Sequence, residues 1–257
     1  MPRLLLYLLC LVSSLATAAD QPLVAAASNL TQALTEIADH YQKSSGSRIK
    51  LSFGSSGNFS RQILQGAPYQ IFISADKSNV DFLIANGKQP LRNKAYVQGQ
   101  IVFFIPTGSR LTGMTDLKGI IEAIEFENYN RLAIANPEVA PYGLAAEQAL
   151  ASAGVWIVNR HKLLIGENIA QTVQFCLSGG VDIGIVPASA AIQPEVRGHG
   201  NFIPIPADWH QPIQQYLVLL TDTNPAAVRF YDYLLAAETQ RMLIKYGYLP
   251  NAGIDQP

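Results

Sequence analysis

The sequence predicts an α/β protein in which helices flank mainly parallel sheets. Short apolar runs alternate with segments whose apolar residues recur at helical spacing, and glycine or proline ends most of these segments. Hydrophobic residues make up 49% of the 257-residue chain and charged residues 14%, which is typical of a globular protein. A chain of this length can bury a substantial core, as one large domain or as two smaller lobes.

The first residues predict a signal peptide. Arg3 precedes an apolar run from Leu4 to Val12, and Ala16-Thr17-Ala18 is a small-x-small cleavage sequence. The apolar run is far shorter than the roughly 20 residues of a membrane span, so we expect no membrane insertion. Residues 1–18 are therefore predicted to be removed. Cys176 then remains as the only thiol, on an apolar helix stripe, which predicts a buried cysteine and no internal disulfide.

The elements of the first half follow one another in βαβ order. Helical stripes carry Leu30 to Tyr41, Phe59 to Ile63 and Val80 to Ile84, and glycines at 46, 66 and 87 end them. Ser78 and Asp81 are a predicted capping pair. The predicted strands are residues 23–27, 49–53, 71–74 and 101–105.

The second half repeats this order. Helices are predicted from Pro141 to Gly154, after Asn168 as N-cap, after Asn224-Pro225, and around Met242 to Tyr246. The predicted strands are residues 132–135, 162–165, 181–186 and 216–220. No linker rich in glycine and serine separates domains, so two lobes would be joined through strands. We expect the crossings near residues 101–106 and 206–213, which places 19–105 with 212–257 in lobe 1 and 106–211 in lobe 2.

Two corners of the first half resemble each other. Ala25 to Leu30 and Phe53 to Asn58 each follow an apolar strand, open a helix and carry a serine there, Ser28 and Ser56. The first N–H groups of a helix lack intrahelical partners, and the helix dipole is positive at that end. Both corners lack Lys and Arg. They therefore predict a neutral, donor-rich binding site for a small oxyanion.

The second half supplies two more corners of this kind. In Asn136 to Gly143 the free N–H groups begin at Tyr142, because Pro141 has none, and in Gly166 to Ile169 the N–H of Ile169 is free. Four helix starts at roughly +0.5 each nominally balance a dianion. A site of donors alone leaves the proton of a protonated phosphate unpaired, so it favours sulfate, molybdate or tungstate.

In this order the corners resemble the periplasmic molybdate-binding proteins of ABC transporters. The similarity spans nearly all of the chain after the signal peptide, in residues 25–30, 53–57, 70–76, 136–143, 166–169 and 182–186. It implies the two-lobed binding-protein fold with the ligand in the hinge cleft. It also implies hydroxyl and backbone donors at Ser28 and Ser56, backbone donors at Tyr142 and Ile169, and a side-chain donor at Asn29. The metal of molybdate would be reached only through its oxygens.

One position departs from the family pattern. Better-known members supply a tyrosine hydroxyl where this chain has Pro187, which offers no donor. Tyr142 stands where those members have a small residue, and its hydroxyl is a candidate replacement. We expect the anion site to be retained and leave its number of donors open.

Alternatives remain for these residues. Ser28 and Ser56 could serve only as helix caps, Asn29 could be a cap or a ligand, and the same fold could hold sulfate or another small anion. A secreted serine hydrolase is less favoured, because residues 54–58, Gly-Ser-Ser-Gly-Asn, lack the last glycine of the nucleophile elbow. We expect no enzyme activity and no cofactor.

The partners follow from charge and resemblance. A formal net charge of −1 argues against a nucleic-acid partner, which favours a basic surface. The resemblance implies a monomeric protein of the periplasm that captures molybdate, and tungstate with it, and delivers the anion to a membrane ABC permease.

Overall fold

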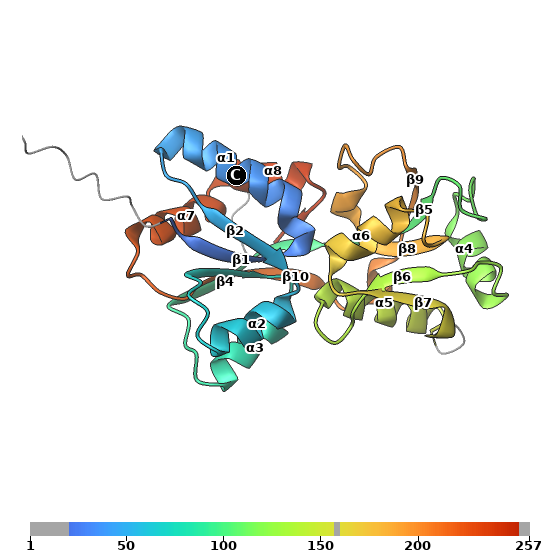
Figure 1. The fold of residues 1–257 in the computed structure, drawn as a ribbon, viewed down its shortest axis with the longest axis horizontal. Helices are drawn as coiled ribbons and strands as arrows, with labels where there is room; N and C mark the ends of the chain where they lie inside the picture. Colours follow the sequence, from blue (N-terminus) through green and yellow to red (C-terminus); the bar gives the residue numbers. More distant parts are fainter. Residues whose placement is uncertain (1–20, 157–159, 252–257) are drawn as a thin grey trace, which may run out of the picture.

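The computed structural model describes residues 21–156 and 160–251 and consists of two mixed sheets, each flanked by helices (Figure 1). The first sheet has the order β11-β4-β10-β3-β1-β2. Its strands are β1 (Leu23–Ala27), β2 (Lys50–Gly54), β3 (Ile71–Ser74), β4 (Arg92–Gly99), β10 (Ile213–Leu219) and β11 (Leu249–Pro250).

Helices cover both faces of this sheet, because successive strand residues point to opposite sides. Val24 and Ala26 of β1 pack under one group of helices, whereas Ala25 packs under the other. The first group comprises α1 (Thr31–Ser45), α7 (Pro225–Leu235) and α8 (Ala237–Lys245), and the second comprises α2 (Ser56–Leu64) and α3 (Ser78–Ala85).

The second sheet has the order β7-β6-β8-β5-β9. Its strands are β5 (Ile101–Pro106), β6 (Leu132–Ala135), β7 (Leu163–Gly166), β8 (Ile183–Pro187) and β9 (Gly200–Pro204). One face packs on α4 (Leu117–Glu125) and α5 (Pro141–Ser152), and the other packs on α6 (Ile169–Leu177). Short 3₁₀ helices complete the chain: η1 (Ser28–Leu30), η2 (Arg160–Lys162), η3 (Ala188–Ala190) and η4 (Ala207–Trp209).

The sheets are mixed rather than mainly parallel. The βαβ strands run parallel, β1 beside β2 and β3, and β6 beside β7 and β8. The strands next to the crossings run the other way: β10 is antiparallel to β3 and β4, and β5 is antiparallel to β8 and β9. The prediction of largely parallel sheets rested on the βαβ units. It did not include the strands through which the chain returns from the other sheet.

The predicted boundary between the lobes differs from the observed division into two sheets by one strand, β5. β5 belongs to the second sheet, so the first crossing falls at Gln100, between β4 and β5, and not after residue 105. The sequence reading also omitted β4, α4, β9 and β11. Pairing with neighbouring strands decides the three strands. The helix α4 carried a clear signal that the sequence analysis overlooked, because Asp116 caps it and Ile120, Ala123 and Ile124 form its buried face.

The predicted helix caps are mostly confirmed. The side chains of Asn168 and Asn224 accept first-turn N–H groups of α6 and α7. The capping pair at Ser78 is wrong: Lys77 is the N-cap, and Asp76 accepts hydrogen bonds from the Ser78 hydroxyl and the Asn79 N–H.

The predicted signal peptide, residues 1–18, lies outside the described residues. Within 21–156 and 160–251, every helix is too short or too polar to cross a bilayer.

Cys176 is buried as predicted, and burial raises the pKa of its thiol to about 12. It lies against β8, where a Cβ added at Gly184 would stand 2.2 Å from the Cys176 Sγ. Gly184→Ala should therefore lower the free energy of unfolding by about 1–3 kcal/mol through overpacking. Urea denaturation of the purified protein measures this change.

Gly180→Ala is the matched control, because its added Cβ would meet no atom closer than 3.5 Å. Adding Cys176→Ala to Gly184→Ala should restore part of the loss. Equal stability of Gly184→Ala and Gly180→Ala would contradict this account of the packing.

Candidate anion-binding site

The four corners predicted from the sequence meet at one small cavity between the two sheets. The cavity measures about 190 Å³, including its opening to solvent. It contains every residue that the sequence proposed for the site. Its lining residues are Ala27, Ser28, Asn29, Gly54, Ser55, Ser56, Ala75, Ala140, Pro141, Tyr142, Asn168 and Ile169.

Strand pairing brings the four corners together as two pairs, one pair in each sheet. β1 and β2 are parallel neighbours that end in register, with Ala27 opposite Gly54, and η1 and α2 begin there. In the second sheet β6 and β7 end with Ala135 opposite Gly166, and α5 and α6 begin shortly beyond. Because the carboxyl ends of parallel strands share one edge, each sheet presents two helix starts to the other.

The electrostatics of the cavity come from backbone groups. No Lys, Arg, Asp, Glu or His is among the described residues that line it. The starts of α2, α5 and α6 face the cavity directly. The fourth start is that of η1, which continues without a break into α1. Each start carries a partial positive charge from N–H groups without intrahelical partners. The cavity is therefore electropositive without a cationic side chain.

The two predicted serines differ in their surroundings. The Ser56 hydroxyl oxygen accepts a hydrogen bond of 3.0 Å from the N–H of Ala75, which leaves the hydroxyl hydrogen to donate. Ser28 is buried, and within 21–156 and 160–251 its hydroxyl makes no hydrogen bond. Both hydroxyl hydrogens are thus free to point at a ligand.

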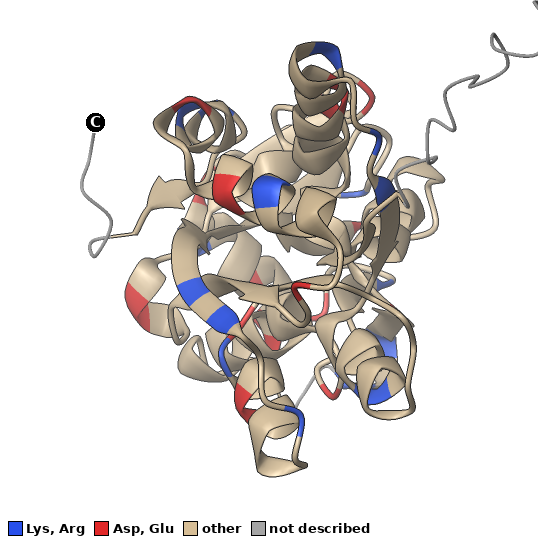
Figure 2. Cartoon of the chain, turned by 90° about the vertical axis from the view of Figure 1, so that its left-hand side faces the viewer, with Lys and Arg blue, Asp and Glu red and all other residues tan. Residues whose placement is uncertain are grey.

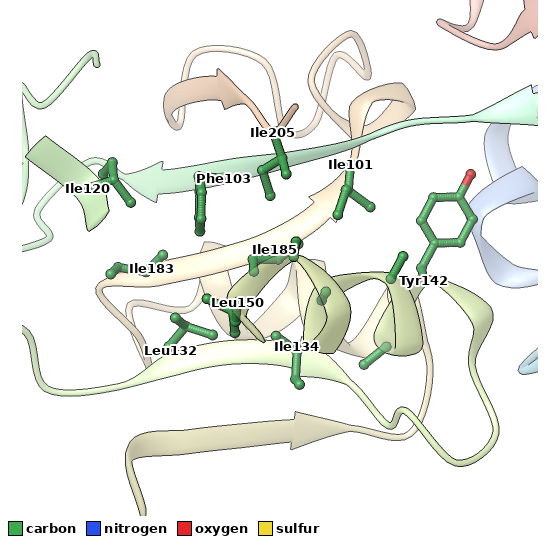
Figure 3. Packing of buried hydrophobic residues seen from close by; sticks show 14 of the residues in the cluster. Ile101, Phe103, Ile120, Leu132, Ile134, Tyr142, Leu150, Ile183, Ile185 and Ile205 are labelled. Atoms are coloured by element: carbon green, nitrogen blue, oxygen red, sulfur yellow. The ribbon is translucent and has the colours of Figure 1, made fainter. Parts of the chain in front are cut away.

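The side chain of Tyr142 extends from α5 of the second lobe to hydrogen-bonding groups of the first lobe. Figure 3 shows the ring at one end of the hydrophobic cluster, with its oxygen directed away from Ile134 and Ile101. That oxygen accepts hydrogen bonds from the Gln215 amide at 3.1 Å and from the Asn29 amide at 3.4 Å. Its own hydrogen has no acceptor within the described part of the chain.

Burial raises the pKa of the Tyr142 hydroxyl well above its ordinary value, so the group stays a neutral donor. The Asn29 amide also donates to the hydroxyl of Tyr248 at 2.9 Å, and burial raises the pKa of Tyr248 to about 12. The Asn29 side chain, expected as a ligand donor, is therefore committed to two tyrosine oxygens.

Gly99, the last residue of β4, makes room for this tyrosine. A Cβ at Gly99 would lie 2.0 Å from the Tyr142 hydroxyl oxygen. The absence of a side chain at the first crossing is therefore what allows a residue of α5 to reach β10 and Asn29.

Sequence reasoning missed Ser55. The residue is 3% exposed, lines the cavity, and its hydroxyl oxygen is buried without a hydrogen-bond partner among the described residues. Sequence reasoning selected only Ser56 of this adjacent pair, and no sequence signal shows which of two neighbouring serines faces a ligand.

The two lobes touch around the cavity. The Gly57 N–H of α2 donates to the Val139 carbonyl at 2.9 Å, and the Asn58 amide donates to Glu167 at 3.1 Å. A Cβ at Gly57 would lie 3.0 Å from the Val139 backbone, so glycine permits this approach. These contacts join the two lobes beside the cavity.

A larger groove of about 1340 Å³, likewise including its opening to solvent, adjoins the cavity and shares Ser28, Asn29 and Ile169 with it. Glu36, Asp39 and Glu195 also line this groove. Carboxylates repel a dianion, so the small cavity is the better anion site despite its size.

The described residues contain no group of three or more His, Cys, Asp and Glu side chains placed to hold a metal ion. None of the four histidines lines the cavity, so Ser55 and Ser56 have no neighbouring imidazole there to act as a base.

Known proteins resemble this chain in sequence and in overall fold. The chain is 34% identical over 228 residues to the molybdate-binding protein ModA of Azotobacter vinelandii, which covers 88% of each chain. It is 34% identical over 246 residues to ModA of Rhodobacter capsulatus, at 94% coverage of each. The solved periplasmic molybdate-binding protein of Azotobacter vinelandii superposes with a TM-score of 0.81 at 28% identity, over 90% of this chain and all of that one.

The family model of the bacterial extracellular solute-binding proteins matches residues 22–249. That range includes both sheets and all four corners of the cavity. The chain therefore belongs to the bacterial extracellular solute-binding protein family.

Proposed function

We propose that this protein captures molybdate, and tungstate with it, for an ABC importer. One observation carries the proposal: four helix starts from two lobes converge on a cavity without a charged side chain. The relatives that are 34% identical over most of the chain are molybdate-binding proteins.

Both backbone N–H groups and side-chain hydroxyl groups donate hydrogen bonds to the anion. Ser28 and Ser56 donate through hydroxyl and backbone groups, and Tyr142 and Ile169 donate backbone N–H groups. The Tyr142 hydroxyl supplies a further donor in place of the one absent at Pro187, with Asn29 and Gln215 holding its oxygen. The molybdenum atom is contacted only through the oxygens of the anion.

Closure of the lobes strengthens this binding. Stripping water from a dianion is very costly, and each charge-assisted hydrogen bond returns about 1.5–3 kcal/mol, so six or seven are needed together. Only the closed arrangement offers donors from both lobes. The anion therefore shifts the population towards the closed state, which the importer would recognise.

The remaining properties are proposed in the same way. The protein acts as a monomer in the periplasm after removal of residues 1–18, and a membrane ABC permease is its partner. It catalyses no reaction and requires no cofactor. A nucleic-acid partner is disfavoured because basic and acidic residues are interspersed on the face in Figure 2, without a basic band.

Titration calorimetry with four sodium salts tests the function. Molybdate and tungstate should bind at least about a hundredfold more tightly than sulfate and phosphate. The proposal requires donors spaced for the larger metal oxyanions rather than for sulfate, and the unpaired proton penalises phosphate. Sulfate binding as tight as molybdate would favour the sulfate alternative. Ester turnover that Ser56→Ala abolishes would favour a hydrolase.

Ser28→Ala should weaken molybdate binding about tenfold or more by removing one charge-assisted donor. Its melting temperature without ligand should stay unchanged, because the Ser28 hydroxyl has no partner to lose among the described residues. Ser56→Ala should weaken binding and also cost about 1–3 kcal/mol of stability, since it leaves the Ala75 N–H unpaired.

Ser44→Ala, at the far end of α1, controls for serine removal and should change neither quantity appreciably. An unchanged molybdate affinity for Ser28→Ala would remove Ser28 from the site.

The molybdate affinity should be constant between about pH 6 and pH 9. No His or carboxylate lines the cavity, and the raised pKa of Tyr142 keeps its hydrogen in place as the pH rises. Calorimetry across this range in buffers of equal ionic strength measures the affinity. A fall towards high pH would indicate that a donor of the site loses its proton.

A further inference from the structure

Ser55 occupies a capping position without acting as a cap. It precedes α2 with an extended backbone, φ −81° and ψ 143°, and its side chain accepts no N–H of the first turn. Asp116, Asn168 and Asn224 show the usual arrangement in this chain, since each accepts a first-turn N–H of its own helix. Serine at an N-cap normally does the same.

The hydroxyl of Ser55 is consequently unsatisfied. Its oxygen is buried and has no hydrogen-bond partner within 21–156 and 160–251. Four other side-chain atoms there share this condition, on Tyr41, Ser189, Gln215 and Thr239. Among the five residues, Ser55 alone lines the anion cavity. A buried hydroxyl without a partner is costly, which points to a partner that arrives with the ligand.

We propose that the Ser55 hydroxyl donates a hydrogen bond to the bound oxyanion and is a ligand-binding residue beside Ser56. This inference rests on the proposed function. The two serines have different roles. The Ala75 N–H fixes the Ser56 oxygen in position, whereas no group of the described residues holds the Ser55 hydroxyl, which turns to the anion.

This role predicts two effects of opposite sign in one variant. Ser55→Ala removes an unpaired buried polar atom, so the melting temperature without ligand should stay the same or rise. The same change removes a charge-assisted donor, so the dissociation constant for molybdate should rise about ten- to a hundredfold. A serine that only capped α2 would lower stability and leave the affinity unchanged.

The experiment combines calorimetry with sodium molybdate and thermal unfolding of the ligand-free protein. Ser60→Ala is the matched control on the same helix: its hydroxyl donates to the Gly57 carbonyl and contacts Asn79, outside the cavity. It should lower the melting temperature without the loss of affinity. Ser55→Gly, which retains an accepted N-cap residue, should reproduce the affinity loss of Ser55→Ala.

The outcomes separate this inference from the proposed function. Wild-type binding of molybdate with unchanged affinity in Ser55→Ala and Ser55→Gly overturns the role of Ser55 and leaves the function intact. A wild-type protein that binds none of molybdate, tungstate and sulfate overturns both.

Discussion

The structure depends on N–H groups that have no partner inside their own helices. Each lobe ends two adjacent parallel strands in register and opens a helix from each corner, so each contributes two electropositive ends to one cavity. Backbone donors are fixed by the fold and neither gain nor lose a proton in the ordinary pH range. A site made of backbone donors from both lobes exists only while the two sheets face each other. Anion binding is therefore coupled to the arrangement of the lobes.

Tyr142 connects the arrangement of the two lobes to the anion site. Its backbone lies at the start of α5 in the second lobe, while its hydroxyl sits among Asn29, Gln215 and Tyr248 of the first. The tyrosine thus packs in one lobe and makes its hydrogen bonds in the other. Gly99, at the crossing between the sheets, leaves the space for it. Contacts such as Gly57 with Val139 then close the rim, so the donors of both halves act on the same volume.

The fold was predictable where local signals were strong. Short apolar runs located β1, β3 and β6, Gly46 located the end of α1, and Asn168 located the start of α6. Strand direction was not predictable, because β5 and β10 run antiparallel only through their pairing with strands far away in sequence. The same limit placed β5 in the wrong lobe. Local residue patterns do not record which sheet a strand joins.

The sequence alone determined the chemistry of the site: serines and free N–H groups at four helix starts, without Lys or Arg, indicate a neutral receptor for an oxyanion. The tertiary structure decided how that chemistry is used. It brought Ser28, Ser56, Tyr142 and Ile169 to one cavity, gave the Asn29 amide to two tyrosines, and left the Ser55 hydroxyl unpaired. These outcomes depend on packing between segments more than a hundred residues apart, and side-chain orientation in such packing is set by neighbours that local sequence does not specify.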